Sequence, residues 1–144
     1  MAKVFKVGLI GCGHISETYF KAHDYFNNIK IIKCADINLD TAKKCANENS
    51  IDSSTVEDLL VDENINIILN LTIPKAHYEV AKKSLEHGKH VYSEKPIAVN
   101  FNDGKNLLKI ANEKNLYIGN APDTFLGGGI QKSIELVSSG TIGD

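Results

Sequence analysis

The first candidate ligand site of this sequence is a glycine-rich turn that follows an apolar run. The segment Val7-Gly8-Leu9-Ile10 leads directly into Gly11-Cys12-Gly13-His14-Ile15-Ser16. Glycine lets a phosphate approach the backbone closely, and free N–H groups at a helix start carry partial positive charge. The spacing G-x-G-x-x-S lacks the third glycine of the usual fingerprint, yet strand, turn and helix together favour a dinucleotide-binding fold. The candidate cofactor contacts here are Gly11, Cys12, Gly13, His14 and Ile15.

An acidic residue ends the second predicted strand. Asp36 follows the β-branched run 29–35 and lies 25 positions after Gly11. In a dinucleotide fold, an acid near this position accepts hydrogen bonds from the adenosine ribose hydroxyls. The next residues, Ile37 and Asn38, provide no arginine for a 2′-phosphate, so the sequence favours NAD over NADP. The alternative is that Asp36 only caps a turn.

Two further polar loops follow predicted strands, where ligands bind in open parallel sheets. The first loop runs over 70–77, and its candidate cofactor contacts are Thr72, Pro74 and His77. The second loop contains Glu94 and Lys95. The lysine is a candidate general acid–base group for a substrate hydroxyl, and the glutamate is a candidate acceptor for a ribose hydroxyl. Spacing alone leaves a solvated surface ion pair as the alternative.

Apolar runs alternate with helix-period segments along the whole chain. The expected strands are 4–10, 29–35, 65–71, 90–92 and 116–118. The expected helices cover 14–27, with Ile15, Tyr19, Ala22 and Phe26 on one face, and segments beginning after Asn38, at Thr55, at Pro74, at Asn102 or Asp103, and near Gly129. Helical crossovers require parallel strands with right-handed connections. The sequence therefore predicts one doubly wound α/β domain over 1–144, with a mostly parallel sheet of about six strands and helices on both faces.

Composition and charge argue against several classes of protein. The chain has 144 residues, of which 42% are hydrophobic and 24% charged, as expected for one globular domain with a packed core. A net charge of -2 without a basic block gives no support for binding nucleic acid or a membrane surface. No apolar run reaches the roughly 18 residues of a membrane span. Cys12, Cys34 and Cys45 are odd in number and lack metal-ligand spacing, so we expect small hydrophobic side chains, no metal site and a cytoplasmic protein.

Taken together, these residues resemble the N-terminal domain of the Gfo/Idh/MocA (glucose–fructose oxidoreductase / inositol dehydrogenase) family. The resemblance runs from about Lys6 to Gly143. It is carried by Gly11-Cys12-Gly13-His14-Ile15, Asp36, Pro74 with His77, Gly88-Lys89-His90-Val91 and, most specifically, Glu94-Lys95-Pro96. It implies an oxidoreductase that transfers hydride between NAD(P) and a hydroxyl carbon of a sugar, cyclitol or related small molecule.

The resemblance also implies roles for individual residues. It places Lys95 near the nicotinamide and the reacting hydroxyl, Glu94 at the nicotinamide ribose and His77 near the nicotinamide. Pro96 is expected to follow a cis peptide bond. Enzymes of the family continue into a second α/β domain, which supplies most of the substrate pocket, a further histidine and aspartate, and the oligomer interface. We therefore expect a fragment that binds dinucleotide, does not turn over alone, and is monomeric where the parent is a homo-oligomer.

Two other functions fit part of the pattern. A non-catalytic dinucleotide-binding or redox-sensing module needs the glycine turn and Asp36 but not Lys95. A methyltransferase that uses S-adenosylmethionine also has a glycine turn and an acid after its second strand, but it gives no reason for Glu94-Lys95-Pro96. Titration against NAD, NADP and S-adenosylmethionine separates these functions, with NAD expected to bind best.

Overall fold

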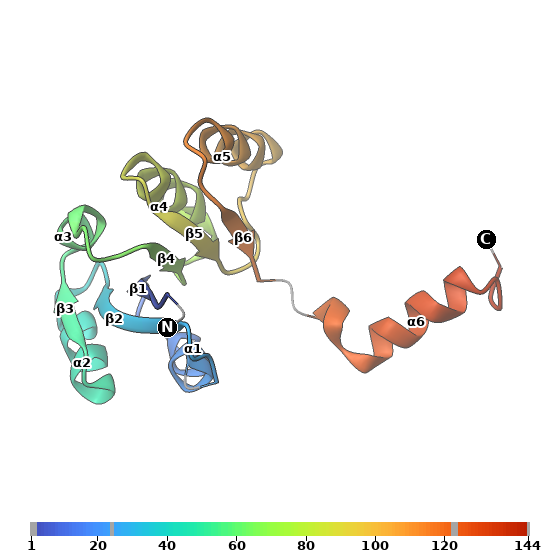
Figure 1. Cartoon of the computed structure of the whole chain (residues 1–144), viewed down its shortest axis with the longest axis horizontal. Helices are drawn as coiled ribbons and strands as arrows, with labels where there is room; N and C mark the ends of the chain where they lie inside the picture. Colours follow the sequence, from blue (N-terminus) through green and yellow to red (C-terminus); the bar gives the residue numbers. More distant parts are fainter. Residues whose placement is uncertain (1–2, 24, 122–123, 144) are drawn as a thin grey trace.

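The computed structural model describes residues 3–23, 25–121 and 124–143. Six parallel strands form one sheet in the order β3-β2-β1-β4-β5-β6 (Figure 1). The order reverses beside β1, as in doubly wound folds that bind ligands at such a switch point. The predicted α/β architecture is therefore confirmed. The strands are β1 (Phe5–Ile10), β2 (Ile29–Ala35), β3 (Asp52–Ser54), β4 (Ile67–Asn70), β5 (His90–Ser93) and β6 (Ile118–Asn120).

Helices cover both faces of the sheet. In Figure 1, α1 and α2 lie below the sheet, and α3, α4 and α5 lie above it. Apolar side chains of β1 alternate between these layers: Leu9 packs on the α1–α2 side and Ile10 on the α3 side. The helices are α1 (Ser16–His23), α2 (Leu39–Asn49), α3 (Val56–Val61), α4 (Pro74–Glu86), α5 (Phe101–Glu113) and α6 (Gly128–Ser138), with a short 3₁₀ helix η1 (Thr124–Leu126).

Several helix starts are the predicted ones. The Asn38 side chain accepts hydrogen bonds from the backbone of Asp40 and Thr41, and Thr55 accepts one from the backbone of Asp58. Pro74 is the first residue of α4, where its missing N–H costs nothing. Each of these three helices therefore begins at the sheet edge where its preceding strand ends.

Other predicted boundaries are wrong. Helix α5 has Asn100 as its N-cap, without a side-chain capping bond, so neither Asn102 nor Asp103 caps it. The last strand lies two residues later than the expected 116–118, and β3 at the sheet edge was not predicted at all. A three-residue edge strand of polar residues carries too little hydrophobic pattern to be read from sequence.

The expected apolar face of the first helix is also wrong in part. Ile15 and Phe26 are 39% and 54% exposed, whereas Phe20 packs into the core at 8% exposure. Tyr19 is half-buried, and the side chain of Ala22 lies outside the described residues. The helix ends at His23 rather than near residue 27, so Phe26 leaves the helical period on which the prediction rested.

Helix α6 lies apart from the sheet (Figure 1). None of its described residues is buried, and Ile130, Ile134 and Val137 are each about half exposed. Among the described residues, no helix combines the length and the apolar composition that a membrane crossing requires.

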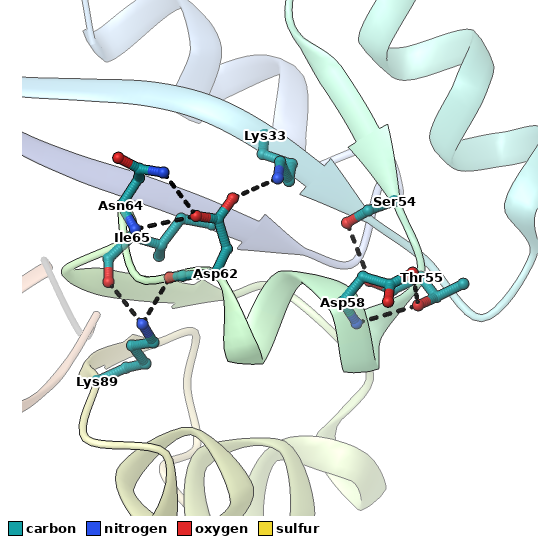
Figure 2. A network of polar contacts seen from close by, with 8 residues as sticks. All are labelled: Lys33, Ser54, Thr55, Asp58, Asp62, Asn64, Ile65 and Lys89. Carbon is teal, nitrogen blue, oxygen red and sulfur yellow. Dashed lines mark hydrogen bonds and ion pairs between the residues drawn. The ribbon is translucent and has the colours of Figure 1, made fainter.

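A polar network holds both ends of α3 (Figure 2). At its start, Thr55 caps the helix through Asp58. At its end, the carboxylate of Asp62 binds the ammonium group of Lys33 from β2. Lys89, which is 7% exposed, donates to the carbonyl oxygens of Asp62 (2.7 Å) and Ile65 (2.9 Å). The network fixes the helix whose first turn borders the site described next.

The carboxyl ends of five strands lie in one row. Ile10 pairs with Ala35 and Asn70, Asn70 pairs with Ser93, and Ser93 pairs with Asn120. The residues that follow these strands therefore lie along one edge of the sheet. This edge carries every candidate site residue of the sequence.

Candidate functional site

The glycine turn is built so that only one of its glycines is required by the fold. Gly11 has a φ of 101°, and a Cβ at this position would lie 2.7 Å from the carbonyl carbon and oxygen of Leu71. A Cβ on Gly13 would have no atom within 4 Å. The first glycine therefore lets the turn pass under the β4 loop, and the second leaves open space above the backbone. Ser16 donates 2.7 Å to the carbonyl oxygen of Gly13 and closes the turn.

Asp36 lies directly beside this turn. Its Oδ2 accepts a 2.8 Å hydrogen bond from the backbone N–H of Cys12, and its Oδ1 accepts a 2.9 Å bond from the backbone N–H of Asn38. The carboxylate thus links the loop after β1 to the loop after β2, and it also borders a cleft. A carboxylate has about four acceptor directions, so two remain for a ligand hydroxyl.

The first cleft of the edge has a volume of about 650 Å³ and lies between the glycine turn and α3. Gly11, Gly13 and Asp36 line one side. The first turn of α3, with Val56, and residues of the β4 loop and α4 line the other. Apolar walls with the carboxylates of Asp36 and Glu57 and with open backbone suit an aromatic base joined to a hydroxylated sugar.

The second cleft, of about 770 Å³, lies on the other side of the glycine turn. It collects residues from the loops after β4 and β5 and from α1. Its lining includes Ile15, Tyr19, Thr72, Pro74, His77, Tyr92, Glu94 and Lys95. The residues predicted in the loops after β4 and β5 therefore line one cleft. The Lys95–Pro96 bond is cis, as predicted.

Glu94 is held by its neighbours, whereas Lys95 is exposed. The Glu94 carboxylate accepts a 2.8 Å bond from the Tyr19 hydroxyl and a 3.1 Å bond from the Lys95 backbone N–H. The residue Lys95 is exposed to solvent. The pair therefore presents a fixed acceptor beside an exposed cation.

His77 is almost fully buried, at 1% exposure, and connects two loops. Its Nε2 lies 2.8 Å from the carbonyl oxygen of Thr72, and its Nδ1 lies within hydrogen-bond distance of the carbonyl oxygen of Pro96. Both ring nitrogens therefore face backbone carbonyl oxygens. The ring therefore positions the loops that carry Thr72 and Lys95 rather than presenting a free nitrogen to the cleft.

Two asparagines and a tyrosine of the site were missed by sequence reasoning. Asn70, fully buried, accepts from the Thr72 hydroxyl (2.7 Å) and donates to the carbonyl oxygen of His77 (3.0 Å). Asn120 donates to the carbonyl oxygens of Ser93 and Glu94, both at 3.0 Å. Both asparagines end strands, and that position is the signal that could have marked them. Tyr19 had only been assigned to the core.

The two clefts share a wall made of Leu71 and Thr72. Of the predicted cofactor contacts, Cys12 and His14 line neither cleft. The Cys12 sulfur lies toward the core, close to two other cysteines, and His14 is exposed. The remaining candidates line the two clefts at the switch point of the sheet.

Comparison with known proteins agrees with this geometry. The family profile described as "Oxidoreductase family, NAD-binding Rossmann fold" matches residues 5–121. The chain is 31% identical over 113 residues to inositol 2-dehydrogenase/D-chiro-inositol 3-dehydrogenase of Lactiplantibacillus plantarum, covering 76% of this chain and 31% of that protein. It is 30% identical over 106 residues to inositol 2-dehydrogenase of Azotobacter vinelandii, covering 71% of this chain and 31% of that protein.

Solved structures share the fold. The WlbA dehydrogenase of Bordetella pertussis, in complex with NADH and UDP-GlcNAcA, superposes with a TM-score of 0.89 at 22% identity, over 97% of this chain and 41% of that one. Biliverdin reductase of Synechocystis, in complex with biliverdin and NADP+, superposes with a TM-score of 0.84 at 24% identity, over 92% of this chain and 42% of that one.

The matched proteins are considerably longer than this chain. It spans 31% of the length of each inositol dehydrogenase named above. The profile nevertheless covers β1 to the end of β6, including the glycine turn, Asp36 and Glu94-Lys95-Pro96. The chain belongs to the Gfo/Idh/MocA family of oxidoreductases, of which it contains the NAD-binding Rossmann-fold domain.

Proposed function

We propose that this chain is the cofactor-binding part of an NAD-dependent oxidoreductase that transfers hydride between nicotinamide and a hydroxyl carbon of a sugar, cyclitol or related small molecule. The observation that carries the proposal is the wall of Leu71 and Thr72 shared by two clefts. One cleft has the acceptor suited to a ribose, and the other has an acid–base pair. A ligand with two nucleoside halves matches this division.

The adenosine half belongs in the first cleft. Asp36 would accept hydrogen bonds from its ribose hydroxyls, and the open backbone at Gly13 would face the pyrophosphate. The N–H groups at the start of α1 add partial positive charge there. These features fit the adenosine and pyrophosphate groups.

The nicotinamide half belongs in the second cleft. Glu94, fixed by Tyr19, would accept a hydrogen bond from the second ribose. When bound, the nicotinamide ring supplies or accepts the hydride. Lys95 would donate a proton to, or accept one from, the substrate oxygen, and its exposure leaves its ammonium group free to reach that oxygen. Lys95 is the residue of this chain to which we assign acid–base catalysis.

NAD is proposed rather than NADP because of the residues around Asp36. The carboxylate would repel a 2′-phosphate on the ribose. Ile37, which is fully exposed, and Asn38, whose side chain caps α2, follow it and supply no cation. The relatives named inositol dehydrogenases support a cyclitol or sugar-like substrate.

Titration of the 144-residue chain against NAD, NADP and S-adenosylmethionine tests the proposal. We expect NAD to bind most tightly, NADP more weakly and S-adenosylmethionine not measurably. Tighter binding of S-adenosylmethionine, or no binding of either dinucleotide, would overturn it. Turnover with NAD and a panel of polyols is measured alongside, and we expect these residues alone to bind without turnover.

A further inference from the structure

The three cysteines of the chain, which are far apart in sequence, meet beneath the glycine turn. Cys12 comes from the turn itself, Cys34 from β2 and Cys45 from α2. Their three sulfur atoms all lie within 4.8 Å of one another, and none forms a disulfide. We predicted from the sequence that these cysteines form no metal site, because their spacing along the chain is not that of metal ligands. In the folded chain, however, the three sulfurs lie close together.

The spacing of the sulfurs is close to what a bound metal ion requires. Zinc binds thiolate sulfur at about 2.3 Å, which puts two sulfurs of a tetrahedral site about 3.8 Å apart. Sulfurs that lie within 4.8 Å of one another exceed this spacing by at most about 1 Å, which corresponds to a shift of about 0.6 Å of each sulfur toward a common centre.

The cysteine cluster lies at the edge of an apolar core. Cys34 and Cys45 are 0% and 7% exposed and pack among apolar residues that include Leu9 and Phe20, while Cys12 is half-buried. The Cys12 and Cys34 thiols lie 3.5 and 3.4 Å from the backbone carbonyl oxygens of Ala35 and Ala42. A thiol gives up its proton when it binds a metal ion, so binding at this cluster releases protons.

The donor set selects the class of ion. Thiolates are soft ligands that favour Zn²⁺ and Cu⁺ over Mg²⁺ or Ca²⁺. Three thiolates with a divalent ion carry one net negative charge, whereas with a monovalent ion they carry two, which costs more in an apolar layer. Three protein ligands leave the fourth position of a tetrahedral zinc ion for water or another donor.

We propose that Cys12, Cys34 and Cys45 bind one Zn²⁺ ion, which ties the glycine turn to β2 and α2. Zinc binding at these cysteines is independent of the proposed oxidoreductase function. It is detected through the metal–thiolate bond and not through NAD binding or turnover, so either proposal can be overturned without the other.

The test is titration of the fully reduced 144-residue chain with Cd²⁺, a spectroscopic substitute for zinc, followed by competition with Zn²⁺. We expect a sulfur-to-metal charge-transfer band that saturates at one equivalent, is lost when an excess of Zn²⁺ displaces Cd²⁺, and is accompanied by proton release. Cys12→Ser, on the half-exposed turn, and Cys45→Ala should each weaken binding at least about tenfold. Circular dichroism verifies that both variants are folded.

His87→Gln is the matched control, because His87 is an exposed metal-binding side chain far from the cluster in sequence. It should leave the titration unchanged. The proposal is overturned by the absence of a charge-transfer band in the reduced, folded wild-type chain, which needs no variant. It is equally overturned if Cd²⁺ binding persists in both cysteine variants or is abolished by His87→Gln.

Discussion

The backbone N–H of Cys12 donates a 2.8 Å hydrogen bond to Oδ2 of Asp36, so the acid that ends β2 holds the glycine turn that follows β1. The other oxygen of the carboxylate accepts from the backbone of Asn38, at the start of α2. Asp36 therefore shapes the turn before any ligand arrives. A substitution here tests both the turn and the proposed ribose contact.

Replacing Asp36 by Asn removes the charge while keeping an acceptor for the Cys12 N–H. A hydrogen bond to a charged group contributes about 1.5–3 kcal/mol, so we expect NAD and AMP each to bind about 10–100-fold more weakly. The preference for NAD over NADP should shrink, because the carboxylate no longer repels the 2′-phosphate. Calorimetric titration with the three nucleotides measures these changes.

Asp40→Asn is the matched control for this variant. Asp40 lies in the first turn of α2, and its side chain is 93% exposed. NAD affinity should stay at the wild-type value in the control. Wild-type affinity in Asp36→Asn as well would remove the ribose role from Asp36.

The two glycines of the turn should respond differently to the same substitution. Gly11→Ala introduces a Cβ at positive φ and 2.7 Å from the Leu71 backbone, and we expect it to lower the free energy of unfolding by about 1–3 kcal/mol. Gly13→Ala meets no protein atom, so the unfolding free energy should change by less than about 1 kcal/mol. Its methyl group should instead weaken NAD binding by about tenfold, which equals about 1.4 kcal/mol. Urea denaturation and NAD titration separate the two effects, and equal destabilisation by both variants would contradict this assignment.

Tyr19→Phe should affect only the nicotinamide half of the site. The substitution removes the 2.8 Å hydrogen bond to Glu94 and leaves the aromatic ring in place. We expect NAD to bind at least about tenfold more weakly, since a hydrogen bond to a charged group contributes about 1.5–3 kcal/mol, while AMP affinity is unchanged. Tyr25→Phe, at a residue that is 85% exposed, is the control. A parallel loss of AMP affinity would mean that the two clefts are not separate subsites.

Acid should destabilise the chain through Asp62. The hydrogen bond from Lys33, with those from Asn64, lowers the pKa of this carboxyl from 3.8 to about 2. Because the folded-state pKa lies below the unfolded one, the ionised carboxylate stabilises the fold above about 3.8, and this stabilisation is lost as the pH falls toward about 2. Asp62→Asn should lower the urea midpoint at neutral pH, and the difference from wild type should vanish near pH 2. If the urea midpoints still differ near pH 2, the destabilisation by Asp62→Asn comes from altered packing and not from the lost charge.

The sequence predicted the elements with strong local signals. A continuous β-branched run located β2 to the residue, and Asn38, Thr55 and Pro74 located three helix starts, because these signals act within a few residues. The strand β3 has no hydrophobic alternation and exists only because β2 pairs with it. Its formation is a tertiary effect that local propensity does not contain.

The site was predictable in its residues but not in their contacts. β1 is followed by the glycine turn, and the other strands end at or just before a polar residue; parallel topology places these ends along one edge of the sheet. Whether His77 faces a ligand or two carbonyl oxygens depends on Thr72 and Pro96, which lie in different loops. The meeting of Cys12 with Cys45 likewise depends on how α2 packs under the turn, which linear spacing does not encode.

The wall of Leu71 and Thr72 between the clefts has a consequence for how affinity accumulates. A molecule with two halves joined across this wall binds its second half at an effective concentration set by the tether, which for short linkers reaches about the millimolar range. AMP and nicotinamide mononucleotide offered as separate molecules would forgo that gain even if each made all its contacts. The pyrophosphate of the dinucleotide would then act as the linker between the two halves as well as a group that is bound. Two weakly binding subsites would together form one site of high affinity.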